Sequence, residues 1–160
     1  IYNGIIMSNN GYKVLCIKST FNSEIVDNLH YGVNKSLENS EVEIIQLEPI
    51  HVPGAFELPY MAKKVLDNEE YKDIDCIITL GCVIKGETAH FEYISSACAN
   101  ALATLNINSK IPILFGVITA LNKEQAIARS EINFNNPDNR NIGFNVANAA
   151  KTLMYDAVLD

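Results

Sequence analysis

Short apolar runs alternate along this chain with segments in which apolar residues recur every three or four positions. The runs predict buried β-strands, and the recurring positions predict amphipathic helices. The expected strands cover 13–17, 42–47, 76–84 and 111–118, with a break in the third strand at Gly81. The expected helices begin near Ser23, Leu58, His90, Asn122 and Gly143.

This alternation predicts a three-layer α/β fold: a flavodoxin-like, four-stranded parallel sheet in the order 2-1-3-4, with helices on both faces. We expect a single domain over residues 1–160, because no repeat or linker divides the chain. Asn22 or Ser23 is expected to cap the first helix, and Asn122 to Gln125 resembles a capping box. The helix from 90 to 105 and the last helix carry small residues on more than one side. Because two sides of each helix can be covered, we expect each helix either to lie within a layer of the fold or to contact a neighbouring subunit.

Composition and charge narrow the class of protein. The chain has 160 residues, 48% of them apolar, and a formal charge of −7 at pH 7. That charge argues against a nucleic-acid partner, and no apolar run approaches the length that crosses a bilayer. The four cysteines lack metal-binding spacing and are expected to be reduced core thiols, with a functional role as the alternative for Cys82. We expect a cytoplasmic protein. Because the chain does not begin with Met, a removed organelle-targeting segment is the alternative.

Candidate chemistry gathers where the expected strands end, because parallel α/β sheets bind ligands at the edge formed by the carboxyl ends of their strands. The loop Lys85–Thr88 is a candidate anion site, since backbone N–H groups and a Lys charge would converge there; an ordinary turn is the alternative. His90 is the candidate proton-transfer group, because imidazole titrates near neutral pH. A His at a helix start also serves as a cap or faces solvent.

Other side chains near this edge have two interpretations each. Phe21 would stack on a flat ring or simply pack, and Glu57 would accept hydrogen bonds from ligand hydroxyls or favour a helix N-terminus. Arg129 is a second phosphate ligand or a surface residue, whereas His30 and His51 are interpreted as surface or packing residues. The sequence shows no metal-ligand cluster, Ser-His-Asp set, GxGxxG or Walker loop. These residues predict a cofactor-free protein that binds a small anion together with a flat or polyol ligand.

Two long motifs and several shorter ones carry a family resemblance. The long motifs are Val-Pro-Gly-Ala-Phe-Glu-Leu-Pro at 52–59 and Gly-Cys-Val-Ile-Lys-Gly-Glu-Thr-Ala-His-Phe-Glu-Tyr at 81–93. The shorter ones are Phe-Asn at 21–22, Pro-Ile-Leu-Phe-Gly-Val-Ile-Thr at 112–119 and Glu-Gln-Ala-x-x-Arg at 124–129. In this order and spacing, from about residue 13 to the end, the chain resembles the 6,7-dimethyl-8-ribityllumazine synthase family.

The resemblance implies a transferase reaction of riboflavin biosynthesis without cofactor or metal. In it, 5-amino-6-(ribitylamino)pyrimidinedione condenses with 3,4-dihydroxy-2-butanone 4-phosphate to 6,7-dimethyl-8-ribityllumazine, and phosphate and water leave. By similarity, His90 moves protons, Phe21 stacks on the pyrimidine, residues 55–57 hold the ribityl chain, and residues 86–88 with Arg129 bind the phosphate. The substrate-binding residues that the resemblance implies are Phe21, Asn22, Gly54, Ala55, Phe56, Glu57, Val83, Ile84, Lys85, Gly86, Glu87, Thr88, Leu114, Phe115 and Arg129.

The family's site lies between the subunits of a pentamer, so Leu114 and Phe115 are expected to enter from a neighbouring subunit. An icosahedral shell is the alternative assembly, and riboflavin synthase is a candidate further partner. One departure from the family is Ile142, which stands where many bacterial members have a Lys before Gly143; Arg140 is the candidate substitute. The alternative function is a non-catalytic flavin- or lumazine-binding assembly protein on the same fold.

Overall fold

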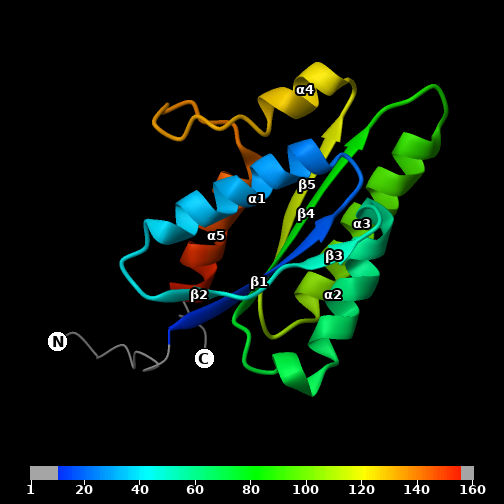
Figure 1. Cartoon of the computed structure of the whole chain (residues 1–160). Coiled ribbons are helices and arrows are strands. Elements are labelled where there is room, and N and C mark those ends of the chain that lie inside the picture. The colour runs from blue at the N-terminus through cyan, green and yellow to red at the C-terminus, as the bar shows by residue number, and fades with distance from the viewer. Residues whose placement is uncertain (1–10, 156–160) are drawn as a thin grey trace.

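The computed structural model describes residues 11–155, which form a parallel β-sheet between two layers of helices (Figure 1). The strands are β1 (Tyr12–Ser19), β2 (Ile44–Gln46), β3 (Ile50–Val52), β4 (Cys76–Ile84) and β5 (Ile113–Ala120). The helices are α1 (Ser23–Glu38), α2 (Leu58–Leu66), α3 (His90–Ile107), α4 (Lys123–Ala128) and α5 (Ile142–Tyr155), with 3-10 turns η1 (Ala55–Glu57) and η2 (Glu69–Tyr71). The predicted α/β class and the parallel sheet are confirmed.

The sheet has the order β2-β1-β4-β5, and β3 pairs with β1 on the same edge as β2. The prediction of four strands was therefore wrong, because the expected strand at 42–47 is followed by a second short edge strand. β2 pairs with residues 12–14 of β1, and β3 pairs with residues 17–19. Pro49 lies between them and has no N–H to donate, so a continuous ladder cannot form along this edge.

The core divides into two parts, one on each face of the sheet. We call them the α1/α5 layer, with Leu29, Val33 and Ala147, and the α2/α3 layer, with Leu58, Cys98 and Leu102. Side chains of β4 alternate between the layers, since Ile78 belongs to the first and Ile77 to the second. Burial on both faces explains why this strand reads as a continuous apolar run.

Strand β4 continues through Gly81 to Ile84, so the predicted break at Gly81 was wrong. A Cβ at Gly81 would lie 3.1 Å from Leu58 Cδ1. The glycine therefore lets the start of α2 pack closely against the strand rather than ending the strand. As a result β4 carries Val83 and Ile84, both half-buried, to the carboxyl edge of the sheet.

The start of α5 packs against α1 at very short range. A Cβ at Gly143 would overlap the backbone carbonyl of Leu29, so only glycine fits there. The preceding Asn141 is fully buried: its Nδ2 donates to the carbonyls of Asn28 (3.2 Å) and Glu131 (3.1 Å), and its Oδ1 accepts from the Phe144 amide (3.0 Å). These bonds anchor the end of the segment between α4 and α5, and α5 begins at Ile142, next to its expected start near Gly143.

The short helix α4 begins as its sequence predicted. Asn122 Oδ1 accepts a hydrogen bond from the Gln125 amide at 2.9 Å, and Gln125 Oε1 accepts one from the Leu121 amide at 2.9 Å. The capping prediction at Asn122 is confirmed, with the return bond reaching Leu121 instead of Asn122 itself.

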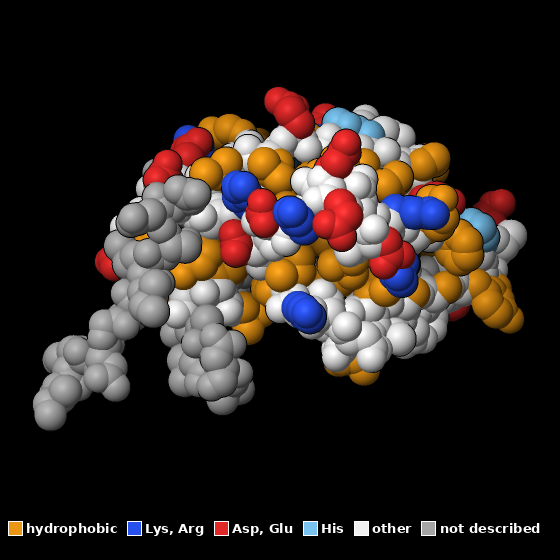
Figure 2. Space-filling view, turned by 90° about the horizontal axis from the view of Figure 1, so that it is seen from below, with side chains coloured by type: hydrophobic (Ala, Val, Ile, Leu, Met, Phe, Trp, Pro, Cys, Tyr) orange, Lys and Arg blue, Asp and Glu red, His pale blue; other side chains and the backbone are white. Residues whose placement is uncertain are grey.

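The surface carries charges of both signs. On the face drawn in Figure 2, acidic and basic side chains are interspersed among apolar ones. Within residues 11–155, no helix has the length and apolar character needed to span a membrane.

Candidate functional site

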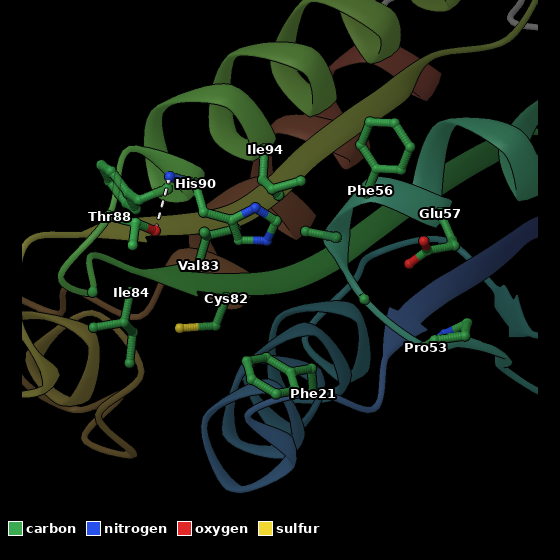
Figure 3. Close-up of a pocket in the computed structure, with 14 residues that line it drawn as sticks. Phe21, Pro53, Phe56, Glu57, Cys82, Val83, Ile84, Thr88, His90 and Ile94 are labelled. Carbon is green, nitrogen blue, oxygen red and sulfur yellow. Dashed lines mark hydrogen bonds between the residues drawn. The ribbon is translucent and has the colours of Figure 1, made fainter.

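A cavity of about 650 Å³ opens where β1, β3 and β4 end at the carboxyl edge of the sheet (Figure 3). It brings together segments that lie far apart in the sequence, as expected for this edge. The residues that line it are Phe21, Pro53, Gly54, Ala55, Phe56, Glu57, Cys82, Val83, Ile84, Gly86, Thr88, His90, Phe91 and Ile94.

Phe21 forms one wall from the connection between β1 and α1, and 68% of its surface is exposed. The next residue, Asn22, has a left-handed backbone (φ 54°), and its Nδ2 donates to the Cys82 carbonyl at 3.0 Å. The expected side-chain cap at Asn22 or Ser23 is absent from α1, because the Asn22 amide reaches across to β4 instead. Asn22 thereby fixes the connection that presents Phe21, without lining the cavity itself.

The segment 53–57 forms the opposite wall and is attached to the Phe21 connection by the backbone. The Thr20 amide donates to the Val52 carbonyl at 2.9 Å, and the Phe21 amide donates to the Pro53 carbonyl at 3.1 Å. Phe56 is 56% exposed although it is a large aromatic residue. A Cβ at Gly54 would lie 3.1 Å from Glu57 Oε2, so the Glu57 carboxylate folds back over this glycine.

The third wall comes from the end of β4 and the start of α3. Figure 3 shows the His90 imidazole directed into the cavity from the first residue of α3, close to Val83 and Ile94. The His90 amide donates to Thr88 Oγ1 at 3.4 Å, so Thr88 holds the turn that leads into the helix. Gly86, in that turn, has nothing within 4 Å of where a Cβ would be. The open turn and the positive end of an 18-residue helix favour an anion here.

Two predicted members of the turn, Lys85 and Glu87, are not among the residues that line the cavity. Lys85 Nζ lies 3.1 Å from Glu92 Oε1 on α3. A backbone hydrogen bond, together with the Lys85 ammonium, holds the pKa of Glu92 below its ordinary value. The candidate anion site of one chain therefore consists mainly of backbone groups and Thr88.

Three other predicted residues lie outside this cavity. Leu114 is half-buried against the α1/α5 layer, and Phe115 on β5 is 39% exposed. Arg129 lines a second cavity of about 430 Å³, together with Arg140, Gln125 and the end of β5. Within the described residues of one chain, Leu114, Phe115 and Arg129 therefore do not line the cavity of Figure 3.

Sequence reasoning did not assign Phe91 and Ile94 to the site. Their spacing of three residues on α3 puts them on one side of the helix, which is the signal that could have identified them. Cys82 also lines the cavity, and burial raises its pKa to about 11, so the thiol is a neutral, apolar part of the floor. All four cysteines are free and buried, which confirms the prediction of core thiols. Among the described residues, no group of three or more His, Cys, Asp and Glu is arranged to hold a metal ion.

A family model described as 6,7-dimethyl-8-ribityllumazine synthase matches residues 11–156. The match covers every segment that lines the cavity of Figure 3, as well as β5 and the Arg129 region. It confirms the resemblance carried by the two long motifs. The chain therefore belongs to the 6,7-dimethyl-8-ribityllumazine synthase family, the transferase enzymes that act in riboflavin biosynthesis.

Proposed function

We propose that this enzyme condenses 5-amino-6-(ribitylamino)pyrimidinedione with 3,4-dihydroxy-2-butanone 4-phosphate to give 6,7-dimethyl-8-ribityllumazine. One observation carries the proposal: a single cavity joins an exposed aromatic ring, a carboxylate, an open turn at a helix start and an imidazole. Its volume of about 650 Å³ suits a small-molecule substrate.

The pyrimidine substrate fits the part of the cavity between Phe21 and the end of β4. An aromatic face that is 68% exposed offers a stacking surface for a flat ring. Val83 and Ile84 offer backbone groups of β4 to the ring's polar edge, and Glu57 accepts hydrogen bonds from the ribityl hydroxyls.

His90 is the proposed acid and base for the proton transfers. The 5-amino group attacks the ketone carbon, water leaves, and an imine forms. Removal of a proton from the carbon next to the imine expels phosphate as the C–O bond breaks, and a proton returned to the terminal carbon makes a methyl group. The ribitylamino nitrogen then attacks the new ketone, and a second water leaves. His90 lies at the cavity, and an imidazole can both accept and donate protons.

The phosphate group would bind at Gly86–Thr88, and we propose that a neighbouring copy supplies Arg129, Leu114 and Phe115. The separation of Arg129 from the first cavity supports this arrangement, because Ala126 of α4 packs in the α1/α5 layer whereas Cys98 of α3 packs in the α2/α3 layer. Helix α4, which ends just before Arg129, and helix α3, which begins with His90, therefore pack in different layers of the fold. The proposed assembly is a pentamer, with an icosahedral shell as the alternative.

The direct test is to give purified protein both substrates and to record the fluorescence of the lumazine product and the release of phosphate. One phosphate per lumazine is expected. A protein that binds lumazine but forms none from saturating substrates would be the non-catalytic assembly protein instead.

A further inference from the structure

Asn22, which follows Phe21 directly, has an unusual backbone conformation. Within residues 11–155 it is the one non-glycine residue with a positive φ, and its φ of 54° and ψ of 45° lie in the left-handed region. L-residues adopt this region rarely, because the side chain crowds the backbone, and surrounding contacts must hold them there. The connection between β1 and α1 therefore keeps a strained conformation next to the residue that forms one wall of the cavity.

The side-chain amide of Asn22 supplies a contact that holds this conformation. Its Nδ2 donates to the Cys82 carbonyl at 3.0 Å, and because a carbonyl oxygen only accepts hydrogen bonds, the orientation of the amide group is fixed. The paired residues of β1 and β4 end at Lys18 and Leu80, so this bond lies beyond the end of the ladder. In the part of the chain that the structure describes, it is the one hydrogen bond between residues 20–22 and β4.

This bond joins two sides of the space proposed for the pyrimidine. Phe21 and Val83 come from different segments that border the cavity (Figure 3), and Asn22 and Cys82 are their neighbours in the chain. The Phe21 backbone is also bonded to the 53–57 segment, but its ring is 68% exposed, so packing of the ring contributes little to its position. The distance between the aromatic face and the end of β4 therefore depends on the Asn22 bond.

We propose that Asn22 is a positioning residue that holds the ring of Phe21 at the distance from β4 that the flat pyrimidine needs. This inference rests on the proposed function and deepens its pyrimidine site. The resemblance implies that Asn22 binds substrate, whereas its side chain is not among those that line the cavity and acts through Phe21. Binding groups must be held within about 0.5 Å of their productive positions, and an exposed ring has that precision only if its backbone is fixed.

The proposed role concerns the pyrimidine and not the phosphate substrate. Among the described residues, no hydrogen bond joins Asn22 to the turn Gly86–Thr88, where the phosphate group would bind. Removal of the Asn22 bond should therefore change the binding of one substrate and leave the binding of the other.

The experiment compares Asn22→Gly, Asn22→Asp, Phe21→Ala and the double variant Phe21→Ala/Asn22→Gly with the unchanged enzyme. Glycine adopts the left-handed region without strain, so Asn22→Gly removes the bond and keeps the backbone. Asn22→Asp keeps the shape of the side chain, but a carboxylate has no N–H to donate. Asn39→Gly is the matched control, because Asn39 Nδ2 donates to the Lys35 carbonyl at 3.2 Å at the other end of α1.

Isothermal titration calorimetry gives the Kd of the pyrimidine substrate without the second substrate, so this measurement needs no turnover. The KM for each substrate is then taken from lumazine fluorescence, and urea unfolding confirms that each variant is folded.

Asn22→Gly and Asn22→Asp should each bind the pyrimidine about 5- to 10-fold more weakly, close to the roughly tenfold loss expected for Phe21→Ala. The double variant should bind it within about twofold of Phe21→Ala, because a ring that is absent cannot be misplaced. In Asn22→Gly the KM for the pyrimidine should rise by the same factor while the KM for the butanone phosphate stays unchanged. Asn39→Gly should bind the pyrimidine as the unchanged enzyme does.

A double variant that loses the product of the two single losses would overturn the proposal, because Asn22 would then act independently of Phe21. Unchanged pyrimidine binding by folded Asn22→Gly would also overturn it, as would an equal rise in both KM values or an equal loss in Asn39→Gly. If the unchanged enzyme formed no lumazine but calorimetry gave the expected pattern, the role of Asn22 would stand and the proposed reaction would fall.

Discussion

Mixing two impaired variants, His90→Ala and Arg129→Ala, tests whether the active site is shared between copies. The two side chains line different cavities of one chain: His90 begins α3 in the α2/α3 layer, whereas Arg129 follows α4, which packs in the α1/α5 layer. If a neighbouring copy supplies Arg129, a site that takes His90 from one variant and Arg129 from the other contains no substitution at all. If both residues act within one chain, every site of a mixed assembly carries a substitution.

The expected recovery follows from the size of each loss and from counting sites. Removal of a general acid or base slows the chemistry by about 10²-fold, and loss of one charged hydrogen bond costs about 1.5–3 kcal/mol in phosphate binding. Below saturation with the butanone phosphate, each variant alone should therefore retain less than about a tenth of the activity. In a ring with one composite site per contact, random mixing in equal amounts restores about one quarter of the sites.

The assay uses two affinity tags, one on each variant, so that co-expressed mixed assemblies can be purified through both tags in turn. Lumazine fluorescence then gives the rate per chain. His90→Ala carrying both tags, mixed with itself, is the matched control and should show no recovery. A mixed assembly no more active than the mean of its two parents would refute the shared site, and a normal KM in Arg129→Ala alone would refute the role of Arg129 altogether.

Three further predictions concern the aromatic wall, the close packing of glycine and the buried thiols. Phe21→Ala should raise the KM for the pyrimidine by about tenfold, as for the loss of a stacking contact, while urea unfolding stays within about 0.5 kcal/mol because this side chain is mostly exposed. Gly143→Ala should lower the free energy of unfolding by about 3 kcal/mol or more, because its Cβ would overlap the Leu29 carbonyl; Gly86→Ala, where the space is open, should change stability little in the same urea titration. Burial raises the pKa of Cys82 from 9.0 to about 11, so the unfolded thiol releases its proton first as the pH rises. The free energy of unfolding should therefore fall between pH 9 and about 11, and less steeply in Cys82→Ala; equal slopes would contradict this cause.

The layers of the fold could be predicted from sequence because their signals are local. Leu29 and Val33 recur at helical spacing on α1 and are buried against the sheet, and the run from 76 to 80 is apolar because both of its faces are covered. Parallel topology then brings the strand ends together without any further information. That is why Phe21, the 53–57 segment and His90 could be predicted to share one edge, and they do share one cavity.

The errors arose where a residue's partner lies far away in the chain. A break in the third expected strand was predicted at Gly81, but a side chain of α2 packs against this glycine and the ladder continues. Asn22 was expected to cap the helix it precedes, but its amide finds the Cys82 carbonyl of β4 instead. One edge strand was expected, at 42–47, but a second short strand, β3, also pairs with β1 on the other side of Pro49. Local propensity cannot detect such partners, because tertiary contacts decide between two locally acceptable structures.

The position of Arg129 is the clearest case of this limit. Its sequence motif predicts a phosphate ligand, and α4 begins at its predicted cap, yet the side chain lines a cavity apart from the turn at Gly86–Thr88. The reason is topological: β5 lies at the edge of the sheet, and the helix that follows it crosses to the α1/α5 layer, whereas α3 covers the other face. In the proposed site, in which both elements hold one phosphate, the Arg129 side chain therefore comes from a second copy of the chain. The family motif predicts which side chains bind the phosphate and implies a site between subunits, and the separation of the two cavities within one chain supports that proposal.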